Sequence, residues 1–576
     1  MELVALEDSL TTGCTWLEEV FHTGEVDDSG NLTDLEVVKL MKKLNTGLTT
    51  VKIQQKLKMT KVTKDKCLEI MDKFEPSKEG RKLGQLGIDG FTAYLLSDEC
   101  DAFDKEDDCV CEDMTQPLSH YFIASSHNTY LLEDQLRGPS SVEGYIRALQ
   151  RGCRCIDLDC WDGPNDQPII YHGRTLTSKI SFKSVIEAIN EHAFVTSDYP
   201  VILSLESHCS LKQQQAMTHY MKTILKDKLH LVEAEENKTF LPSPETLRKK
   251  IIVKGKKLAL GVKELEGYVT EEDESADMER SRRNAKRTGE PKKYKLSRDL
   301  SDIVSYCRSV RFKDFQSSQQ RQRYYEMCSL SESSALKLAN ASPEEFVNHN
   351  KRFLSRIYPN SMRVDSSNYN PQDLWNCGCQ LVALNYQTSG LMMDLNDGRF
   401  LQNGGCGYVL KPAVMRDEMA YFSANTRDLI PGVSPLILHI KVISGQRFPK
   451  PKGSGAKGDT IDPYVTVEIF GIPADCAEER TKTVQHNGYN PLFDESFEFQ
   501  VNLPELALVR FAVLDDDYIG DEFISQYTIP FECLQTGYRH IRLKSNTGDV
   551  IPNCTLFVHI AVTNKRGGGV SANISY

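Results

Sequence analysis

The first hundred residues place apolar side chains in groups at the spacing of amphipathic helices. Two such groups, at residues 16–21 and 37–44, flank a polar segment of twelve residues at 25–36. The pattern predicts an α-helical region over residues 1–110 that contains a helix, a loop and a second helix. This arrangement is typical of an EF-hand.

The polar segment carries oxygen ligands at positions 1, 3, 5 and 12 of the loop, and Gly30 is at position 6, where a calcium loop turns sharply. The four side chains are Glu25, Asp27, Ser29 and Glu36. Because position 1 is Glu instead of the usual Asp, we favour an EF-hand that is kept as a packing unit. Calcium binding is the alternative.

From residue 113 to 263 the pattern changes to short apolar runs that end in polar residues. The runs that indicate strands are at 121–124, 153–158, 168–171, 201–205 and 251–253. Helical periodicity covers 142–149 and 182–189 between them. Strands that alternate with helices predict parallel βαβ units.

Residues 264–298 interrupt this alternation. An acidic run at 271–274 is followed by eight cations between 280 and 295, with almost no apolar residues. This composition predicts a disordered charged linker. Strand and helix alternation resumes over 299–415, with clear strands at 379–385 and 407–411. The two blocks together approach the roughly 250 residues of a (β/α)8 barrel, so we expect one TIM-like barrel split by a linker.

Residues 432–564 are all-β, and residues 565–576 form a loose tail by composition. Short apolar runs at 436–442, 464–470, 497–501, 507–514 and 555–562 are joined by Gly, Pro and Asp turns. Strands at this spacing predict a β-sandwich.

Charge, cysteine usage and hydropathy narrow the classes of function. A net charge of −12 disfavours nucleic-acid binding, which needs clustered cations. The 17 cysteines are scattered without zinc-site spacing, so we expect reduced thiols. The sequence has no apolar stretch of membrane-spanning length and no signal-peptide pattern at its start. We therefore expect a monomeric cytoplasmic protein that contacts anionic membrane surfaces locally, as a peripheral protein.

In a (β/α)8 barrel the active site lies at the carboxyl ends of the strands. Taken in order, the predicted strand ends carry His127, Asn128, Asp157, Asp159, His172, Glu206, Lys254 and Lys256. The carboxylates and the Asn128 oxygen are hard ligands suited to Ca²⁺, while a histidine moves protons near neutral pH. Lysines suit substrate phosphates as point charges. The set therefore predicts a calcium site beside proton-transfer and phosphate-binding groups.

The motifs around these residues resemble the X and Y regions of eukaryotic phosphoinositide-specific phospholipase C. The X-like motifs are Ser-His-Asn-Thr-Tyr at 126–130, Gly-Cys-Arg-Cys at 152–155, Asp-Cys-Trp-Asp-Gly at 159–163, Tyr-His-Gly at 171–173 and Leu-Ser-Leu-Glu at 203–206. The Y-like motifs are Arg-Ile-Tyr-Pro at 356–359, Asp-Ser-Ser-Asn-Tyr at 365–369, Gly-Cys-Gln at 378–380 and Gly-Tyr-Val-Leu-Lys-Pro at 407–412. The order of domains resembles the delta and zeta classes, with a C-terminal C2 domain. We expect no pleckstrin-homology domain.

The resemblance implies how the site works. His127 stabilises the charged transition state, and His172 is the general acid toward the diacylglycerol oxygen. The calcium ligands are Asn128, Asp157, Asp159 and Glu206, and Asp157 is also a candidate to take the proton of the inositol 2-hydroxyl. That hydroxyl attacks the adjacent phosphorus, and water opens the resulting cyclic phosphodiester.

The resemblance also implies a set of substrate contacts. The ring phosphates are bound by Lys254, Lys256, Ser329 and Arg356, and Tyr358 stacks on the inositol ring. Two positions depart from the family pattern, because Asp157 stands where the family has Glu and Ser207 where it usually has Asn. Asp is one methylene shorter than Glu, so the effect of Asp157 on activity is open.

Three features are candidates for membrane recruitment. Asp462, Asp515 and Asp517 match calcium-binding loops of C2 domains, and an acidic loop without calcium is the alternative. A second candidate is an apolar ridge on the barrel rim, for which ordinary core packing is the alternative; its members are Leu136, Leu176, Leu336 and Met362. The basic half of the linker is the third, because cations near the surface favour anionic lipid.

Two functions of different classes fit the sequence. The first is a calcium-dependent phosphodiesterase that cleaves phosphatidylinositol 4,5-bisphosphate into diacylglycerol and inositol 1,4,5-trisphosphate in calcium signalling. The second is a catalytically weak or silent phosphoinositide-binding scaffold of the same fold. Retention of both His127 and His172 favours the enzyme. The sequence leaves open the delta or zeta class, truncation, the upstream activator and the target membrane.

Overall fold

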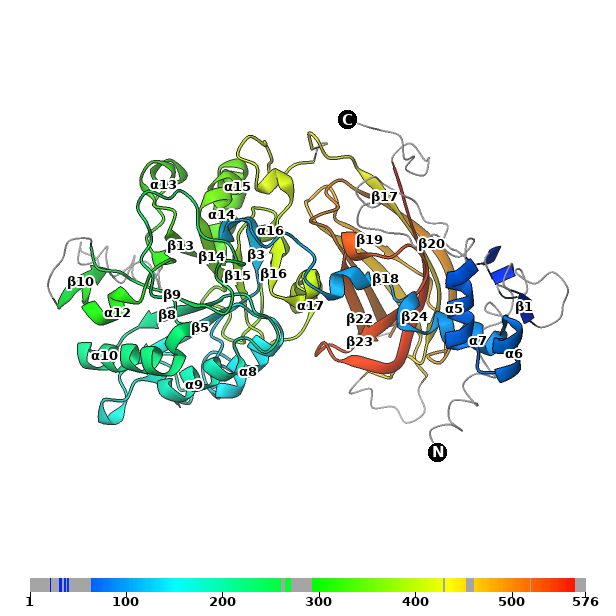
Figure 1. The fold of residues 1–576 in the computed structure, drawn as a ribbon, viewed down its shortest axis with the longest axis horizontal. Helices are drawn as coiled ribbons and strands as arrows, with labels where there is room; N and C mark the ends of the chain where they lie inside the picture. The colour runs from blue at the N-terminus through cyan, green and yellow to red at the C-terminus, as the bar shows by residue number, and fades with distance from the viewer. Residues whose placement is uncertain are drawn as a thin grey trace. The chain divides into compact units, whose positions relative to one another are not determined.

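The computed structural model describes residues 21, 31–33, 36–37, 39–40, 64–259, 265–270, 293–427, 430–451, 460–517 and 520–564. The chain divides into two compact units. The barrel unit comprises residues 105–431 and 471–474, and the sandwich unit comprises 1–104, 432–470 and 475–576. Figure 1 shows the helices and strands of both and labels most of them.

A closed ring of parallel strands forms the centre of the barrel unit. Its members are β4 (Ser125–Ser126), β5 (Cys155–Trp161), β8 (Val201–Ser207), β9 (Ile251–Lys254), β12 (Arg308–Ser309), β13 (Glu326–Ser331), β14 (Leu354–Tyr358) and β15 (Leu381–Leu384). Consecutive strands pair in parallel, β15 returns to β4, and a bridge between Gly255 and Arg308 joins β9 to β12. The predicted split (β/α)8 barrel is confirmed.

Helices cover the outside of this ring (Figure 1). They include α8 (Val142–Gln150), α9 (Phe182–His192), α10 (Leu211–Tyr220), α12 (Arg298–Asp302), α13 (Phe315–Arg321), α14 (Glu332–Ala341), α15 (Pro343–Arg352), α16 (Gln372–Trp375) and α17 (Leu391–Arg399). In α8, Ser141 caps the first turn by accepting a hydrogen bond from the backbone of Glu143. Its apolar face buries Tyr145 and Leu149 in one core with Ile156 and Leu158 of β5. The packing of the outer helices against the ring thereby fixes the positions of the strand ends.

The predictions for the first and third strands of the barrel are wrong. The run at 121–124 is β3 (Tyr121–Ile123), which pairs antiparallel with β16 (Tyr408–Leu410) outside the ring. The run at 168–171 is β6 (Ile169–Ile170), antiparallel to β5 and to β7 (Ile180–Ser181). The connection from β5 to β6 is too short for a parallel crossover, which needs a dozen or more residues. His172 therefore stands on the loop of a hairpin that leaves the ring.

The disorder predicted across 264–298 is corrected at both ends of that range. β10 (Glu266–Thr270) pairs antiparallel with β11 (Lys293–Ser297) over five register positions. Lys295 lies 2.5 Å from the Glu266 carboxylate and 5.9 Å from the centre of the Tyr268 ring. Cross-strand pairs of this kind stabilise a hairpin despite its charge. The acidic run and most of the basic run, at 271–292, lie outside the described residues.

Antiparallel strands form the sandwich of the second unit. They are β17 (Leu436–Gln446), β18 (Pro463–Phe470), β19 (Ala477–Arg480), β20 (Leu492–Val501), β21 (Leu508–Asp515), β22 (Glu522–Pro530), β23 (Gly537–Lys544) and β24 (Val550–Asn564). Their order is β19-β18-β21-β22-β23-β24-β17-β20, and β22 meets β23 only at Gln526 and Lys544. The sheet therefore consists of two four-stranded halves that are joined as in a barrel. This confirms the predicted C2-type sandwich.

The described part of the N-terminal region is mainly helical, as predicted. It contains α5 (Lys64–Phe74), α6 (Lys78–Leu83) and α7 (Ile88–Leu95), together with the short antiparallel pair β1 (Asn31–Thr33) and β2 (Gln85–Gly87). Leu32 and Leu86 face each other in this pair and are fully buried in a core that also contains Phe91. Among the residues described, no helix has both the length and the apolar character needed to cross a bilayer.

Candidate active site

The predicted site residues gather at the carboxyl ends of the barrel strands. In the strand register Asp157 lies beside Ser204, Asp159 beside Glu206 and Ser329 beside Arg356. His127 and Asn128 follow β4 directly, and Lys254 ends β9 beside Ser204. The ring geometry, which places all these ends on one face, therefore brings these side chains into one site.

His127 is half-buried, and its orientation is fixed by Asn385. Its Nδ1 lies 2.9 Å from Asn385 Oδ1, while Asn385 Nδ2 donates to the carbonyl of Ser367. Because this bond turns the amide oxygen toward the ring, His127 Nδ1 carries the hydrogen. Burial lowers the pKa of His127 to about 4, and the Asp157 carboxylate opposes this shift. The ring is neutral at pH 7 and leaves Nε2 for a ligand.

His172 is anchored in the same way from the hairpin loop. Its Nδ1 lies 2.7 Å from the backbone carbonyl of Gln135, and its own backbone N–H donates to Thr177 Oγ1. A carbonyl oxygen only accepts, so His172 Nδ1 must be the donor. A positive charge on His172 disfavours protonation of His127 and so adds to the lowering of the His127 pKa.

Asp157 forms a buried ion pair with Arg356. The Arg356 Nη2 donates to both carboxylate oxygens at 2.7 and 2.6 Å, and both side chains are more than nine-tenths buried. The backbone N–H of Asn128 also donates to Asp157 Oδ2, at 3.1 Å. Although burial works against the charged form, Asp157 keeps the pKa of Arg356 above its usual value. A predicted metal ligand and a predicted phosphate ligand therefore bind each other.

The other two carboxylates have different partners. Tyr130 donates its hydroxyl to Asp159 Oδ2 at 2.5 Å, and His208 Nε2 lies 2.9 Å from Glu206 Oε1. Burial raises the pKa of Asp159 well above its usual range, and the charges of Glu206 and Asp157 raise it further. Mutual repulsion among buried carboxylates is relieved when a cation lies between them.

The donor set fits a hard cation such as Ca²⁺. Carboxylate oxygens of Asp159 and Glu206 gather beside Asp157, and the Asn128 amide gives its N–H to Gln135 so that its oxygen is left as a ligand. In the described part of the chain, however, no three His, Cys, Asp or Glu side chains already stand in a metal-binding arrangement.

The predicted phosphate ligands include two buried polar atoms that make no hydrogen bond within the described residues. The side chains of Lys254 and Lys256 are almost fully buried, and Lys254 Nζ lies 3.4 Å from Ser204 Oγ. Ser329 Oγ and Arg356 Nε are buried without a hydrogen-bond partner in the structure. Buried polar atoms without a hydrogen-bond partner are rare in native proteins, and they are suited to binding a polar ligand.

Tyr358 is buried next to Arg356 at the end of β14. The guanidinium carbon of Arg356 lies 6.0 Å from the centre of the Tyr358 ring. Burial raises the pKa of the Tyr358 phenol to about 12. The ring is therefore neutral at pH 7, and it stands in the site where stacking on a sugar was predicted.

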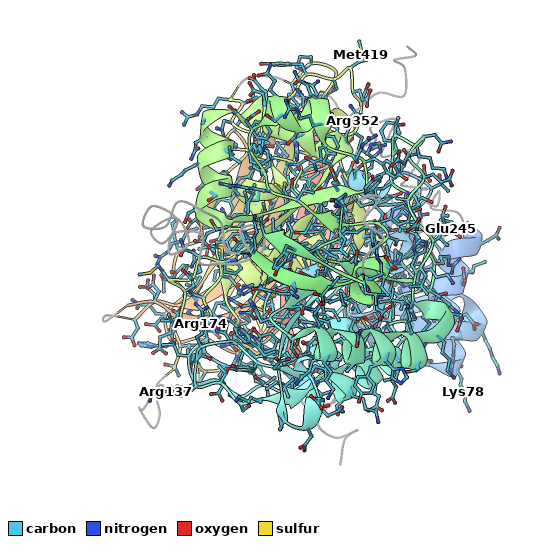
Figure 2. All side chains as sticks on the ribbon, turned by 90° about the vertical axis from the view of Figure 1, so that its left-hand side faces the viewer. Lys78, Arg137, Arg174, Glu245, Arg352 and Met419 are labelled. Atoms are coloured by element: carbon cyan, nitrogen blue, oxygen red, sulfur yellow. The ribbon has the colours of Figure 1, made fainter. Side chains whose placement is uncertain are left out.

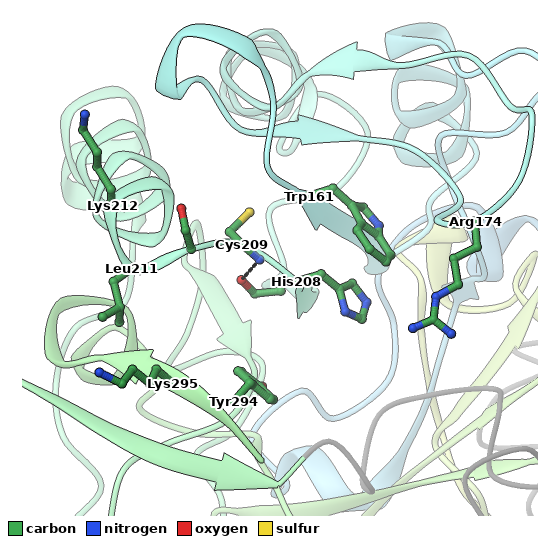
Figure 3. A pocket seen from close by; sticks show the side chains of 10 residues that line it. Trp161, Arg174, His208, Cys209, Leu211, Lys212, Tyr294 and Lys295 are labelled. Carbon is green, nitrogen blue, oxygen red and sulfur yellow. Dashed lines mark hydrogen bonds between the residues drawn. The ribbon is translucent and has the colours of Figure 1, made fainter. Parts of the chain in front are cut away.

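A cavity of about 630 Å³ adjoins Glu206 on the rim of the barrel. Figure 3 shows Trp161, His208 and Arg174 around it, and the rings of Trp161 and His208 are stacked with their centroids 4.0 Å apart. This stack holds His208 against Glu206. Tyr294 and Lys295 of β11 line the opposite side, so the end of the interrupting segment borders the site.

Sequence reasoning missed Gln135, Asn385 and Tyr130. Tyr130 lies inside the motif at 126–130, and Asn385 ends the predicted strand at 379–385, so their positions signalled proximity but not their contacts. Gln135 lies outside the motif at 126–130 and outside the predicted strands, and only the fold of its loop brings it to the site.

Three of the four predicted ridge residues are exposed. Leu136, Leu176 and Met362 are exposed at 49%, 76% and 82%, whereas Leu336 is half-buried. The backbone N–H of Leu176 donates to the carbonyl of Leu136 at 2.9 Å, so these two loops are neighbours. Figure 2 labels Arg137 and Arg174, which lie on the same side of the view.

The predicted calcium loops of the sandwich unit are linked to each other by hydrogen bonds. Asp515 Oδ1 accepts from the backbone of Asp462 at 2.7 Å, and Asp462 Oδ1 accepts from the backbone of His486 at 2.6 Å. The His486 ring Nδ1 also lies 3.2 Å from Asp462, while Asp517 is exposed. A histidine side chain therefore occupies part of the space around these carboxylates.

Only one of the four predicted EF-hand ligands is described. Glu36 is buried and accepts hydrogen bonds from the backbone N–H and the hydroxyl of Thr33, at 2.8 and 2.6 Å. The bond to the Thr33 backbone is one half of a capping box, in which a carboxylate stabilises the start of a helix. Glu25, Asp27 and Ser29 lie outside the described residues.

Family models match most of the chain. The model described as phosphatidylinositol-specific phospholipase C, X domain, matches residues 114–257, and the corresponding Y domain matches 300–414. A C2 domain model matches 436–544, and the model described as phosphoinositide-specific phospholipase C, efhand-like, matches 38–105.

Curated relatives carry two different kinds of name. Inactive phospholipase C-like protein 2 of Homo sapiens is 54% identical over 98% of this chain and 56% of its own length. The 1-phosphatidylinositol 4,5-bisphosphate phosphodiesterase delta-4 of Xenopus laevis is 50% identical over 87% of this chain and 67% of its own length. The chain thus spans little more than half of the first of these relatives.

One solved structure is similar over nearly the whole chain. The crystal structure of L. pealei PLC21 superimposes with a TM-score of 0.81 and 36% identity, and it covers 95% of this chain and 68% of that one.

Proposed function

Because the chain belongs to the phosphoinositide-specific phospholipase C family, we propose that it is a calcium-dependent phosphodiesterase acting on phosphatidylinositol 4,5-bisphosphate. The products are diacylglycerol and inositol 1,4,5-trisphosphate, which places the protein in calcium signalling. One observation carries the proposal: both site histidines are anchored at Nδ1 by acceptors, at the strand ends that carry the buried Asp157 and the half-buried Asp159 and Glu206. Each ring therefore has a defined Nε2 for the substrate.

The two histidines divide the work at the phosphorus. The inositol 2-hydroxyl attacks the phosphorus, and the bond to the diacylglycerol oxygen breaks. His172 in its protonated form gives its Nε2 proton to that leaving oxygen, while its Nδ1 proton stays on the Gln135 carbonyl. His127 is neutral in the structure, and the negative charge of a bound phosphate favours its protonated form, which donates from Nε2 to a phosphate oxygen. In the second step His172 takes a proton from the water that opens the cyclic phosphodiester.

The acidic residues and the cations complete the site. Asn128, Asp157, Asp159 and Glu206 would hold Ca²⁺, which when bound lowers the pKa of the inositol 2-hydroxyl and offsets the phosphate charge. Asp157 is a candidate to take the hydroxyl proton, for which one of its oxygens must leave Arg356. Lys254, Lys256, Ser329 and Arg356 bind the ring phosphates through buried donors, and Tyr358 stacks on the ring.

A second candidate function follows from the ion pair between Asp157 and Arg356. With both of its oxygens bound to the arginine, Asp157 is a poorer metal ligand and a weaker base than it is when the pair opens. A chain that keeps the pair closed binds phosphoinositides without cleaving them. Relatives with 54% identity carry the name inactive phospholipase C-like protein, which supports the absence of cleavage in this second candidate.

One assay separates the two functions. The full chain is mixed with micelles that contain phosphatidylinositol 4,5-bisphosphate, and the release of water-soluble inositol phosphate is measured with calcium and with a calcium chelator. We expect release with calcium, which the chelator abolishes. Micelle binding without release would favour the scaffold, and the His172→Ala variant gives the background.

Membrane contact is the second part of the proposal. We infer peripheral association with anionic membranes through the exposed rim residues Leu136, Leu176 and Met362 and through the loops of the sandwich unit. Exposed apolar side chains grouped on neighbouring loops are unfavourable in water and enter a lipid surface readily. Partitioning onto vesicles, measured for the wild type and a Leu176→Ser variant, tests this contact.

A further inference from the structure

The side chain of Gln135 joins three segments of the site by hydrogen bonds. It is 94% buried, given an exposed fraction of 6%. Its Oε1 accepts from Asn128 Nδ2 at 2.7 Å, and its Nε2 donates to Ser366 Oγ at 2.8 Å and to Asn385 Oδ1 at 3.4 Å. Its backbone carbonyl accepts from His172 Nδ1 at 2.7 Å. A single residue therefore contacts one predicted calcium ligand and one histidine directly, and the other histidine through Asn385.

The direction of each hydrogen bond in this chain is determined. Ser366 Oγ donates to the backbone carbonyl of Glu133 at 2.7 Å, so it accepts from Gln135 Nε2. Gln135 must then present Oε1 to Asn128, and Asn128 must present its Nδ2 to Gln135. The oxygen of the Asn128 amide is left for a ligand, as a cation site requires.

The same amide supports the tautomer of His127. Asn385 Oδ1 accepts from both His127 Nδ1 and Gln135 Nε2, while its Nδ2 donates to Ser367. A flipped Asn385 would turn its N–H groups toward two donors. The Gln135 side chain is the second donor to Asn385 Oδ1. It therefore favours the orientation of the Asn385 amide that keeps the hydrogen on His127 Nδ1.

We propose that Gln135 is a positioning residue that fixes the amide of Asn128 and the rings of His127 and His172 in one hydrogen-bonded arrangement. The proposal rests on the proposed function, because it assigns Asn128 as a cation ligand and the histidines as the groups that act on phosphate. It adds a buried neutral residue that touches neither cation nor substrate. Residues of this kind hold ligands in orientation, and their loss typically lowers metal affinity about 10- to 100-fold.

Two variants and a matched control test this role. Gln135→Met keeps the length and volume of the side chain but removes every hydrogen bond it makes. Ser366→Ala breaks the chain of hydrogen bonds at its far end and leaves Gln135 in place. Gln380→Met is the control, because Gln380 is also fully buried and donates to three backbone carbonyls, those of Ser119, Asn350 and Phe353, that are not part of the site.

Two readouts are measured on each full-length protein. Calcium binding by titration calorimetry reports on Asn128. Long-range proton–nitrogen correlation spectra of histidine-labelled protein report the tautomers of His127 and His172, assigned with His127→Gln and His172→Gln variants. For Gln135→Met we expect calcium affinity to fall about tenfold or more and the His127 signal to show a mixture of tautomers. Ser366→Ala should change both readouts in the same direction by a smaller factor.

The control and the outcomes separate positioning from general stability. Gln380→Met should lower the melting temperature while it leaves calcium affinity and both tautomers unchanged. A Gln135→Met protein with the calcium affinity and the His127 tautomer of the wild type would overturn the proposal. If Gln135→Met does not fold, Ser366→Ala decides in the same way. A wild type that releases no inositol phosphate defeats the proposed function, whereas the tautomer readout still tests Gln135 because it needs no substrate.

Discussion

The acidic cluster at the barrel mouth and the acidic cluster in the sandwich loops are held in different ways. In the barrel, Asp157 is bound by Arg356, which is 199 residues away in the sequence, and both side chains are buried. In the sandwich loops, Asp462 and Asp515 are bound by backbone N–H groups, and Asp517 is exposed. A cation entering the barrel meets a carboxylate that is already paired with a buried arginine, whereas one entering the loops meets carboxylates held by backbone N–H groups nearer the surface.

The comparison shows that aspartates in two regions of one protein can be suited to different functions, because their burial and their hydrogen-bond partners differ. Buried carboxylates on strands have fixed geometry, which chemistry requires, and their charge is expensive unless it is paired. Carboxylates on exposed loops have little desolvation to overcome and suit a reversible response to calcium. We therefore expect the barrel to determine turnover and the loops to influence membrane binding alone.

The largest expected effect is on turnover in the barrel. His172→Ala and His127→Ala should each lower turnover on mixed micelles about 100-fold or more, because positioned acid–base groups usually contribute at least that much. Asp517→Asn in the exposed loop is the matched control and should leave turnover on micelles unchanged. Retention of more than about a tenth of wild-type activity by either histidine variant would contradict the assigned roles.

The next effect is on stability, through the buried ion pair. Arg356→Met should lower the free energy of unfolding by about 3–5 kcal/mol in the presence of a calcium chelator, because Asp157 is left buried and unpaired. Calcium should restore part of this loss, since a cation can take the place of the guanidinium. Thermal unfolding with chelator and with calcium measures both. An equal loss in the two conditions would show that calcium does not reach Asp157.

A smaller effect concerns the length of the side chain at position 157. Asp157→Glu should raise turnover, or lower the calcium needed for half-maximal activity, by up to about tenfold, because its carboxylate extends further toward the metal and the 2-hydroxyl. Calcium titrations of activity for both proteins measure this. Equal or poorer performance of the Glu variant would mean that the neighbours of Asp157 have already adjusted to the shorter side chain.

The smallest effect is expected in the sandwich loops. His486→Asn removes the ring whose Nδ1 lies 3.2 Å from Asp462, and the backbone N–H bond to Asp462 remains. Calcium-dependent binding to anionic vesicles should rise about twofold to threefold, as expected for one small change in an exposed site. Sedimentation with vesicles at several calcium concentrations measures it. A change in micelle turnover of the same size would instead link the loops to catalysis.

The sequence was informative about elements and weaker about partners. The spacing of hydrophobic residues and the composition predicted the barrel and the sandwich. They also predicted the strand ends at Asp157, Asp159 and Glu206, because strands and helices depend on local sequence patterns. The orientation of β3 and β6 was mistaken, because a short apolar run carries no information about the strand with which it pairs. The contact between Asp157 and Arg356 depends on the closure of the ring, which no local pattern encodes.

The site contacts were hidden for a related reason. Gln135 is a single polar residue in a loop, and its role arises from Ser366 and Asn385, which are 231 and 250 residues away. Hydrogen bonds over such separations follow from tertiary structure alone. The hairpin of β10 and β11 was missed because its charged composition masked the pairing of Glu266 with Lys295.

The bridge between Gly255 and Arg308, which joins β9 to β12, has a consequence for how the barrel can be assembled. The chain leaves the ring after β9 and returns at β12. The half of the ring that ends with β9 and the half that begins with β12 are therefore connected in sequence only at this junction, which we call a seam. At the opposite seam β15 pairs with β4 through two register positions, and side chains of both halves share one core. Because association of the halves depends on these contacts and not on the peptide bond between them, residues 105–270 and 293–431 expressed as separate fragments should reassemble into a working barrel.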